Sequence, residues 1–340
     1  MSERKKNLFN AAFVTIYSVF AGKDLGDIAE TITEAEPVYL LLGMGCVVLF
    51  IWGESKILHY MFGTLGIRTR RRTCFMYSCV GFFFSCITPS AGGGQPAQIL
   101  YMRKNMIPVP VATVVLMIVT ITYKLVLVAV GCFLVLFCRG TMDRYMWEVL
   151  PVFYLGLGLN VVCCTAMLIL VFHTSLARNI VMKLLDLLGG FRVFRRLAAK
   201  KERLTLTMDH YGDTAAYLKQ HKRVLVNVLL LTFMQRIALF FVTFFVYRSF
   251  GLHGTAMWRI VLLQASISVS VDMLPLPGGM GISEHLFLTI FDPIFYGDFL
   301  LPGMVLSRGI AYYVQLFFSA AVTAGAHFMF KRRGSRTKCT

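Results

Sequence analysis

Charged residues are scarce in this chain of 340 amino acids, because Asp, Glu, Lys and Arg make up 15% of it, against about 25% in an ordinary soluble domain. Apolar residues make up 57%, and the mean hydropathy is +0.69. Several stretches of about twenty residues carry almost no charge, which is the length a helix needs to cross about 30 Å of hydrocarbon. The composition excludes a soluble enzyme, a disordered protein and a secreted disulfide scaffold. It predicts an all-α polytopic membrane protein.

Enzyme and metal-site motifs are also lacking. The sequence contains no His-Glu-x-x-His, no phosphate-binding loop ending in Gly-Lys-Ser/Thr and no Gly-x-Ser-x-Gly. Its nine cysteines lie mostly inside apolar segments and do not have zinc-ligand spacing. We therefore expect no metal, no cofactor and no catalytic residue in this chain alone.

The apolar stretches predict about eight membrane segments. They cover residues 8–21, 38–58, 73–87, 109–138, 150–172, 224–247, 255–274 and 301–330. The first would be only about 21 Å long as a helix and follows three basic residues, so it is either a short span or a signal peptide. Both alternatives leave the N-terminus in the cytoplasm.

Basic residues collect in alternate loops. The loops that would share one side hold 25 Lys and Arg residues, and the loops of the other side hold five. Cytoplasmic loops are the ones enriched in Lys and Arg. The sequence thus predicts a multi-pass protein of the cytoplasmic membrane, with both termini and the loop at residues 173–223 inside.

This charge distribution requires the chain to turn back twice within the membrane. Arg72 and Lys104 fall on the same side although an apolar segment separates them, and the same holds for Arg259 and Asp298. We therefore expect two re-entrant hairpins, each broken by Pro and Gly. The first break lies at residues 88–96 and the second at residues 275–284.

Two halves of opposite orientation follow from this pattern, at residues 1–172 and 224–340. In each half a break precedes a long span with a single cation, Lys124 in the first and Arg308 in the second. Interrupted segments at corresponding places of inverted repeats mark a transport site near the bilayer midplane.

Between the halves, residues 175–222 alternate apolar and basic side chains. This amphipathic pattern favours a helix on the anionic lipids of the inner leaflet, or one packed beneath the membrane bundle. The net charge of +17 would suggest nucleic acid in a soluble protein. In a membrane protein the loop positions account for the charge, so we expect no nucleic-acid partner.

The second break reads P-L-P-G-G-M-G-I-S-E over residues 275–284. The spacing P-x-P-G-G-x-G-x-x-E resembles the signature of the flippase-like transmembrane domain of the lysylphosphatidylglycerol synthase family. Residues 88–96 are similar to the other hairpin of that family, and the resemblance covers essentially the whole chain. It implies lipid transport and a connection with antibiotic resistance.

Two features depart from that family. Full-length synthases continue into more spans and a soluble aminoacyl-transferase domain, whereas this sequence ends at Thr340, so we expect a stand-alone membrane domain. Many relatives also have an acidic residue before the basic one in the span after the first break, where this chain has Tyr123 and Lys124.

The breaks suggest an anion site. A helix that begins at a glycine-rich break exposes its first N–H groups and its positive dipole end. Two such helix ends, together with Lys124 and Arg308, would suit the phosphodiester of a lipid headgroup. The candidate residues are Gly92, Gly93, Gly94, Gln95, Lys124, Gly278, Gly279, Gly281, Ser283, Glu284 and Arg308. Alternatively, the glycines only let helices pack closely.

Three roles are open for Glu284, and Asp272 is a similar candidate. Glu284 would complement its own helix dipole, pair with Arg308, or bind the amine of an aminoacylated headgroup. Gln95 and Gln98 would bond headgroup hydroxyls or satisfy the broken backbone.

The sequence therefore favours a flippase-like transporter of an anionic or aminoacylated phospholipid, such as lysylphosphatidylglycerol, or of a lipid-linked sugar. One alternative is the membrane part of a phosphatidylglycerol lysyltransferase, which would use lysyl-tRNA and a separate catalytic partner. Another is a scaffold that docks cell-envelope proteins through residues 175–222.

Overall fold

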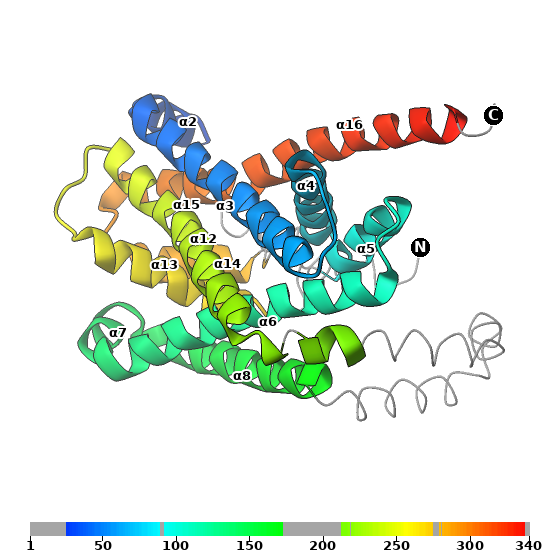
Figure 1. Ribbon diagram of the computed structural model, residues 1–340. Helices are drawn as coiled ribbons and strands as arrows, with labels where there is room; N and C mark the ends of the chain where they lie inside the picture. The colour runs from blue at the N-terminus through cyan, green and yellow to red at the C-terminus, as the bar shows by residue number, and fades with distance from the viewer. Residues whose placement is uncertain are drawn as a thin grey trace, which may run out of the picture.

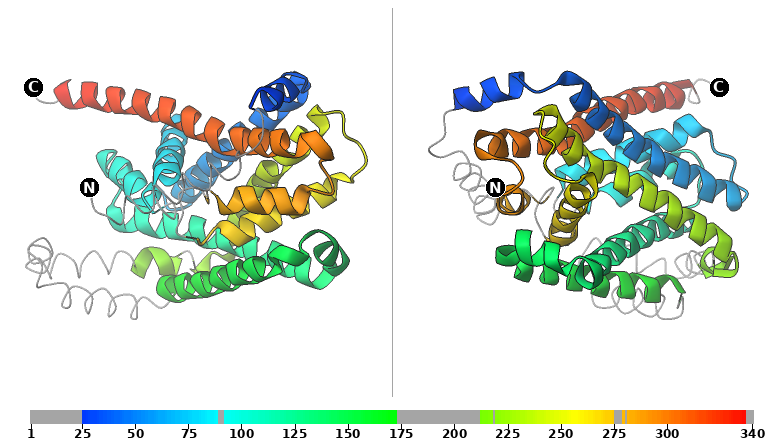
Figure 2. Two further views of the ribbon diagram at one scale, coloured as in Figure 1. Left: turned by 180° about the vertical axis from the view of Figure 1, so that it is seen from behind. Right: turned by 90° about the vertical axis from the view of Figure 1, so that its left-hand side faces the viewer.

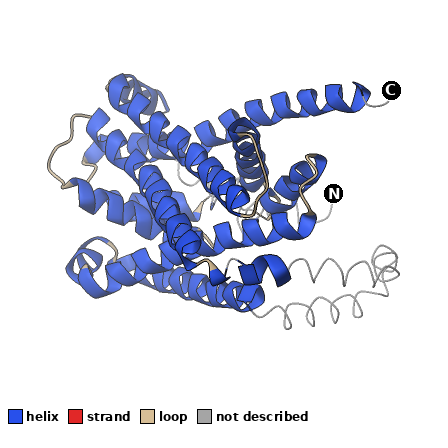
Figure 3. Cartoon of the chain, in the orientation of Figure 1, coloured by secondary structure: helices blue, strands red, loops and turns tan. Residues whose placement is uncertain are grey.

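The computed structural model describes residues 25–88, 92–172, 212–217, 219–274, 279 and 281–336. Within them every regular element is a helix (Figure 1, Figure 3). Five helical stretches are long and apolar enough to span a membrane: Pro37–Thr64, Val109–Phe137, Trp147–Val171, Lys222–Ser249 and Gly297–Gly325. The protein is thus an all-α polytopic membrane protein, as predicted. The predicted segment at residues 8–21 and most of the basic stretch at 175–222 lie outside the described residues.

The first half contains seven α-helices and a short 3-10 turn in the described range. They are α2 (Leu25–Thr33), α3 (Pro37–Thr64), α4 (Arg71–Ile87), α5 (Gly94–Lys104), α6 (Val109–Phe137), α7 (Arg139–Tyr145), η2 (Trp147–Val149) and α8 (Leu150–Phe172). Both α3 and α6 have a proline at one of their first two positions, where its missing N–H is not needed. The short helices α2 and α7 lie in stretches that the sequence analysis treated as loops.

The second half repeats the order of a long helix, two short helices around a break and a final long run. Its elements are α12 (Lys222–Ser249), α13 (Met257–Val271), α14 (Ile282–Phe291), η4 (Gly297–Phe299), α15 (Leu300–Arg308), η5 (Gly309–Val314) and α16 (Gln315–Arg336). The segment predicted at residues 301–330 is one helical run, but η5 within it is a π-helix. This widened turn begins directly after Arg308, and such turns are frequent at functional sites.

The long helices alternate in direction. In Figure 1, α3, α8 and α16 run from left to right, whereas α6 and α12 run from right to left. This is the alternation that a chain crossing a membrane back and forth requires.

Helices of the two halves pack against one another throughout the molecule. The long helix α12 packs along α3, α16 packs against α4, and α13 packs against both α6 and α8 (Figure 2). Two apolar clusters form the interior, one around Phe287 and Tyr247 and the other around Tyr77 and Phe62. The breaks of both halves are consequently held within a single helical body.

Candidate functional site

The first break is closed by Thr88, which follows the end of α4. Its Oγ1 donates to the carbonyl oxygen of Phe84 at 2.6 Å and accepts from the backbone N–H of Gly93 at 2.9 Å. A Cβ atom on Gly94 would lie 2.7 Å from the carbonyl oxygen of Gly81 in α4. Glycine at position 94 therefore allows α5 to begin directly against α4, as the packing alternative requires. Gly92 lies exposed in the turn before it.

The second break depends on two glycines with left-handed backbone. Gly279 has a φ of +67° and Gly281 a φ of +88°, a region that favours glycine. Ser283 donates from its Oγ to the carbonyl oxygen of Gly279 at 2.9 Å. Gly278, another candidate, lies outside the described residues. The glycine-rich motif thus sets the backbone path into α14.

Glu284 caps the helix that follows. Its Oε2 accepts from the backbone N–H of Gly281 at 2.6 Å and from the Oγ of Ser283 at 3.0 Å. A carboxylate in the first turn also complements the positive end of the helix dipole. The N-terminus of α14 is thus already occupied by an anionic group of the protein.

The same carboxylate pairs with Arg308. Arg308 Nε donates to Glu284 Oε1 at 2.9 Å, and each side chain is 20% exposed. Two of the three roles considered for Glu284, the cap and the ion pair, therefore occur together in this structure.

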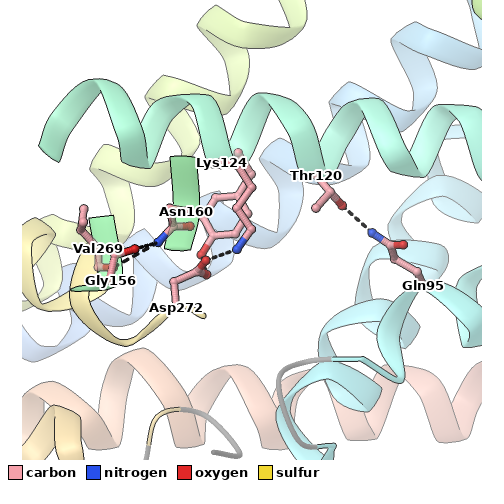
Figure 4. A network of polar contacts seen from close by, with 8 residues as sticks. Gln95, Thr120, Lys124, Gly156, Asn160, Val269 and Asp272 are labelled. Atoms are coloured by element: carbon pink, nitrogen blue, oxygen red, sulfur yellow. Dashed lines mark hydrogen bonds and ion pairs between the residues drawn. The ribbon is translucent and has the colours of Figure 1, made fainter. Parts of the chain in front are cut away.

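Lys124 is paired as well, and its partner comes from the other half of the chain. Its ammonium donates to Asp272 Oδ2, and the hydroxyl of Tyr123 donates to Asp272 Oδ1 (Figure 4). Lys124 is only 4% exposed. Asp272 directly follows α13, just before the second break, so an acidic residue of one half neutralises the buried cation of the other.

One face of helix α6 contacts Gln95 of the first break and Asp272, which lies just before the second break. Gln95, in the first turn of α5, donates from its Nε2 to Thr120 Oγ1. Thr120 and Lys124 are one turn apart and so lie on the same side of α6. Figure 4 shows the two contacts side by side, with Gln95 reaching α6 from one direction and Asp272 from the other.

The run from α15 into η5 makes the corresponding connection in the second half. Arg308 binds Glu284 of the second break, and one turn later the hydroxyl of Tyr312 donates to the carbonyl oxygen of Cys86 at 2.8 Å. Cys86 lies in the last turn of α4, directly before the first break. Each cation-bearing run therefore contacts one break directly and the helix end beside the other.

Asp272 is fixed by the packing of α8 on α13. A Cβ atom on Gly156 would lie 2.6 Å from both the Cα and the carbonyl oxygen of Ser270. One turn further, the amide of Asn160 donates to the carbonyl oxygen of Val269 at 3.1 Å (Figure 4). The short distance between the two backbones holds the end of α13 opposite Lys124.

The sequence analysis did not assign Arg236 or Tyr123 to the site. The guanidinium of Arg236 in α12 lies 3.6 Å from the centroid of the Tyr123 ring, and its buried Nε has no hydrogen-bond partner among the described residues. An arginine inside an apolar segment is the signal that would have included it, because such residues are costly and usually functional. Tyr123 had no such signal.

Gln98 serves the interior of the protein. Its Nε2 donates to Glu54 Oε1 at 3.0 Å and lies 3.2 Å from the carbonyl oxygen of Tyr77. Gln98 is only 4% exposed, and these acceptors belong to α3 and α4 and not to the interrupted backbone of the first break.

The site as a whole offers both signs of charge. Lys124 and Arg308 each face a carboxylate, so an incoming anion meets cations that are already paired, and an incoming amine meets two carboxylates. We define the paired cluster as Lys124, Asp272, Glu284 and Arg308.

Comparison with known protein families agrees with this architecture. Residues 8–319 match the family described as the lysylphosphatidylglycerol synthase TM region, a range that includes both breaks and the entire paired cluster. A search among curated proteins finds no match to this chain. The chain belongs to the family of the lysylphosphatidylglycerol synthase TM region.

Proposed function

We propose that this membrane protein moves an anionic or aminoacylated phospholipid from one leaflet to the other. The observation that carries the proposal is that contacts from both breaks, or from the helix ends beside them, converge on the two helical runs that bear Lys124 and Arg308. Gln95 and Asp272 contact α6, and Glu284 and Cys86 contact the run from α15 into η5. Interrupted helices that converge between inverted halves are typical of transporter substrate sites.

The charges of the paired cluster suit a headgroup that carries both a phosphate and an amine. Lys124 and Arg308 would bind the phosphate, and Asp272 and Glu284 would receive the amine. Such a headgroup replaces each internal ion pair with a new one, so no buried charge is left without a partner. Lysylphosphatidylglycerol has this chemistry, whereas plain phosphatidylglycerol supplies only the phosphate.

The two helix starts would play different parts. The cap residue of α5, Gly93, makes no side-chain capping bond, so the first turn of α5 offers N–H groups to a phosphate. The corresponding turn of α14 holds the carboxylate of Glu284. In this proposal the phosphate rests at α5 beside Lys124, and the amine is held near Glu284.

Transport would follow from movement of one half against the other. The contact between Lys124 and Asp272 joins α6 to the end of α13, so this pair must break when the halves separate. In the proposed topology the protein lies in the cytoplasmic membrane with both termini inside, and both breaks are re-entrant.

Leaflet exchange in liposomes tests the proposal. The purified protein is reconstituted with either lysylphosphatidylglycerol or phosphatidylglycerol, and exchange is followed with an outer-leaflet-specific amine label or quench. We expect faster exchange with the protein, more so for the aminoacylated lipid, and its loss in the double variant Lys124→Ala, Arg308→Ala. The matched control is Arg103→Ala, Lys104→Ala at the exposed end of α5. Equal exchange in the two double variants would reject the site.

The topology has its own test. In a variant whose only thiol is Cys339, an impermeant maleimide added to intact cells should label the protein only after permeabilisation. A cysteine introduced at Arg139, the first residue of α7, should be labelled without permeabilisation. The reverse pattern would contradict the proposed orientation.

The description of the family as a synthase region favours a second candidate, the membrane part of a phosphatidylglycerol lysyltransferase. In this case the chain would accept lipid for a separate catalytic partner. Transfer of lysine from lysyl-tRNA to phosphatidylglycerol by the purified chain alone would replace the transporter proposal. Transfer only after addition of a partner would support this second candidate.

A further inference from the structure

A groove of about 760 Å³ lies on the outside of the helical body, apart from the paired cluster. The residues that line it come from α3, α4, α12 and α16. Of these helices, α4 packs against both α3 and α16 (Figures 1 and 2). Trp52, Phe75, Leu231 and Val322 contribute apolar walls. None of the four residues of the paired cluster lines it.

Three cations also line this groove. Lys56 comes from α3, and Arg71 and Arg72 come from the first turn of α4; all three are exposed. The ammonium of Lys56 lies 4.3 Å from the centroid of the Trp52 ring. In the part of the chain that the structure describes, no carboxylate pairs with any of these cations, in contrast to Lys124 and Arg308.

We propose that this groove binds an anionic phospholipid. The acyl chain would lie on the apolar wall from Trp52 to Val322, and the phosphate would bind Lys56, Arg71 and Arg72. Cations next to a membrane surface attract anionic lipids, and lysine extends its charge to the interface while its stem stays on apolar surface. A free phosphate would leave the apolar wall empty, so a lipid is the occupant that uses the whole groove.

The role of this groove in transport rests on the proposed function, whereas the binding of lipid to the groove is independent of transport. The charge distribution of the loops assigns Arg71 and Arg72 to the cytoplasmic face, so the groove would hold inner-leaflet lipid. There it would collect an anionic lipid next to the first hairpin before the headgroup enters between the breaks.

Trp52 provides a direct reporter. The chain has three tryptophans, so Trp147→Phe with Trp258→Phe leaves Trp52 as the single tryptophan. The full chain is placed in phosphatidylcholine vesicles that contain a small fraction of phosphatidylglycerol with a brominated acyl chain. We expect stronger quenching of Trp52 than with the same fraction of brominated phosphatidylcholine. Removing the cations should weaken binding about fivefold for each one lost.

The variant Lys56→Gln, Arg71→Gln, Arg72→Gln removes all three charges, and Lys56→Met alone serves as a milder second variant. The control is Arg103→Gln, Lys104→Gln, which removes two exposed cations that do not line the groove. Thermal unfolding followed by circular dichroism verifies that each variant is folded. Equal quenching by the two brominated lipids, or unchanged quenching in the folded Lys56→Met variant, would overturn the proposal.

The same assay separates this inference from the proposed function. The variant Lys124→Ala, Arg308→Ala should lose lipid exchange and keep selective quenching. Selective quenching in the single-tryptophan protein with Lys124 and Arg308 intact, without lipid exchange, would support the groove and contradict the transporter. Lipid exchange without selective quenching would support the transporter and contradict lipid binding in the groove.

Discussion

Lys124 of α6 and Asp272 at the end of α13 form an ion pair although 148 positions separate them in the sequence. The contact joins the first half of the chain to the second. It also satisfies a lysine that is 4% exposed and would otherwise be buried without a counter-charge. The two halves are therefore connected by charge between α6 and the end of α13, just before the second break.

We expect Asp272→Asn to destabilise the protein, because it leaves the ammonium of Lys124 buried without a negative partner. Breaking one side of a buried pair costs about 3–5 kcal/mol, whereas replacing both partners with apolar residues is often close to neutral. The double variant Lys124→Met, Asp272→Leu should therefore recover most of the loss. Thermal unfolding in detergent, followed by circular dichroism, measures both. A double variant as unstable as the sum of Lys124→Met and Asp272→Leu would show that the pair is not coupled.

Substitution of Glu284 by alanine should lower the stability of the protein more than substitution by glutamine. The amide of Glu284→Gln keeps an oxygen that accepts from the Gly281 N–H but loses the charge opposite Arg308. Glu284→Ala loses the cap as well, at about 1–3 kcal/mol for the unsatisfied groups. Unfolding midpoints should rank wild type, Gln, then Ala. The control is Glu30→Gln at an exposed position of α2, which should leave the unfolding midpoint unchanged. Equal midpoints for the Gln and Ala variants would show that the cap contributes nothing.

Two glycines in α8 should respond differently to the same change. A methyl group on Gly156 would lie 2.6 Å from the backbone of Ser270, whereas at Gly158 nothing lies within 4 Å. Gly156→Ala should cost about 1–3 kcal/mol, because backbone atoms cannot move aside as side chains do. Gly158→Ala should be neutral or stabilising by up to about 1 kcal/mol from helix propensity. Equal unfolding midpoints for the two variants would contradict the close approach of α8 and α13.

The first break should loosen when the Thr88 hydroxyl is removed. Thr88→Val removes the acceptor for the Gly93 N–H and the donor to the Phe84 carbonyl, a loss of about 1 kcal/mol for each bond. Hydrogen exchange followed by mass spectrometry should show faster exchange in peptides that contain Gly93. Thr88→Ser keeps the hydroxyl and should exchange like the wild type. Equally fast exchange in both variants would show that the Thr88 hydroxyl alone does not hold the first break.

The sequence by itself determined the class of the protein and its long apolar helices, and its Pro- and Gly-rich motifs predicted the breaks. Long uncharged stretches predict spans because hydrocarbon excludes unpaired polar groups, and Pro and Gly mark interruptions because their effect on the backbone is local. Lys124 and Arg308 were recognisable because a charge inside an apolar segment is conspicuous in any sequence, and Glu284 because it ends the glycine-rich motif of the second break. The π-helical turn at η5 and the short helices α2 and α7 had no such local signal.

Only the tertiary structure decided which charges meet. From the sequence, an ion pair between Glu284 and Arg308 was one of three roles proposed for Glu284. The sequence identified no partner for Asp272. It also left Arg236 and Tyr123 outside the site and attached no importance to Gly156. Contacts such as Lys124 with Asp272, or Gly156 with Ser270, join residues more than a hundred positions apart. They depend on how complete helices pack, and the local periodicity of a sequence does not specify that packing.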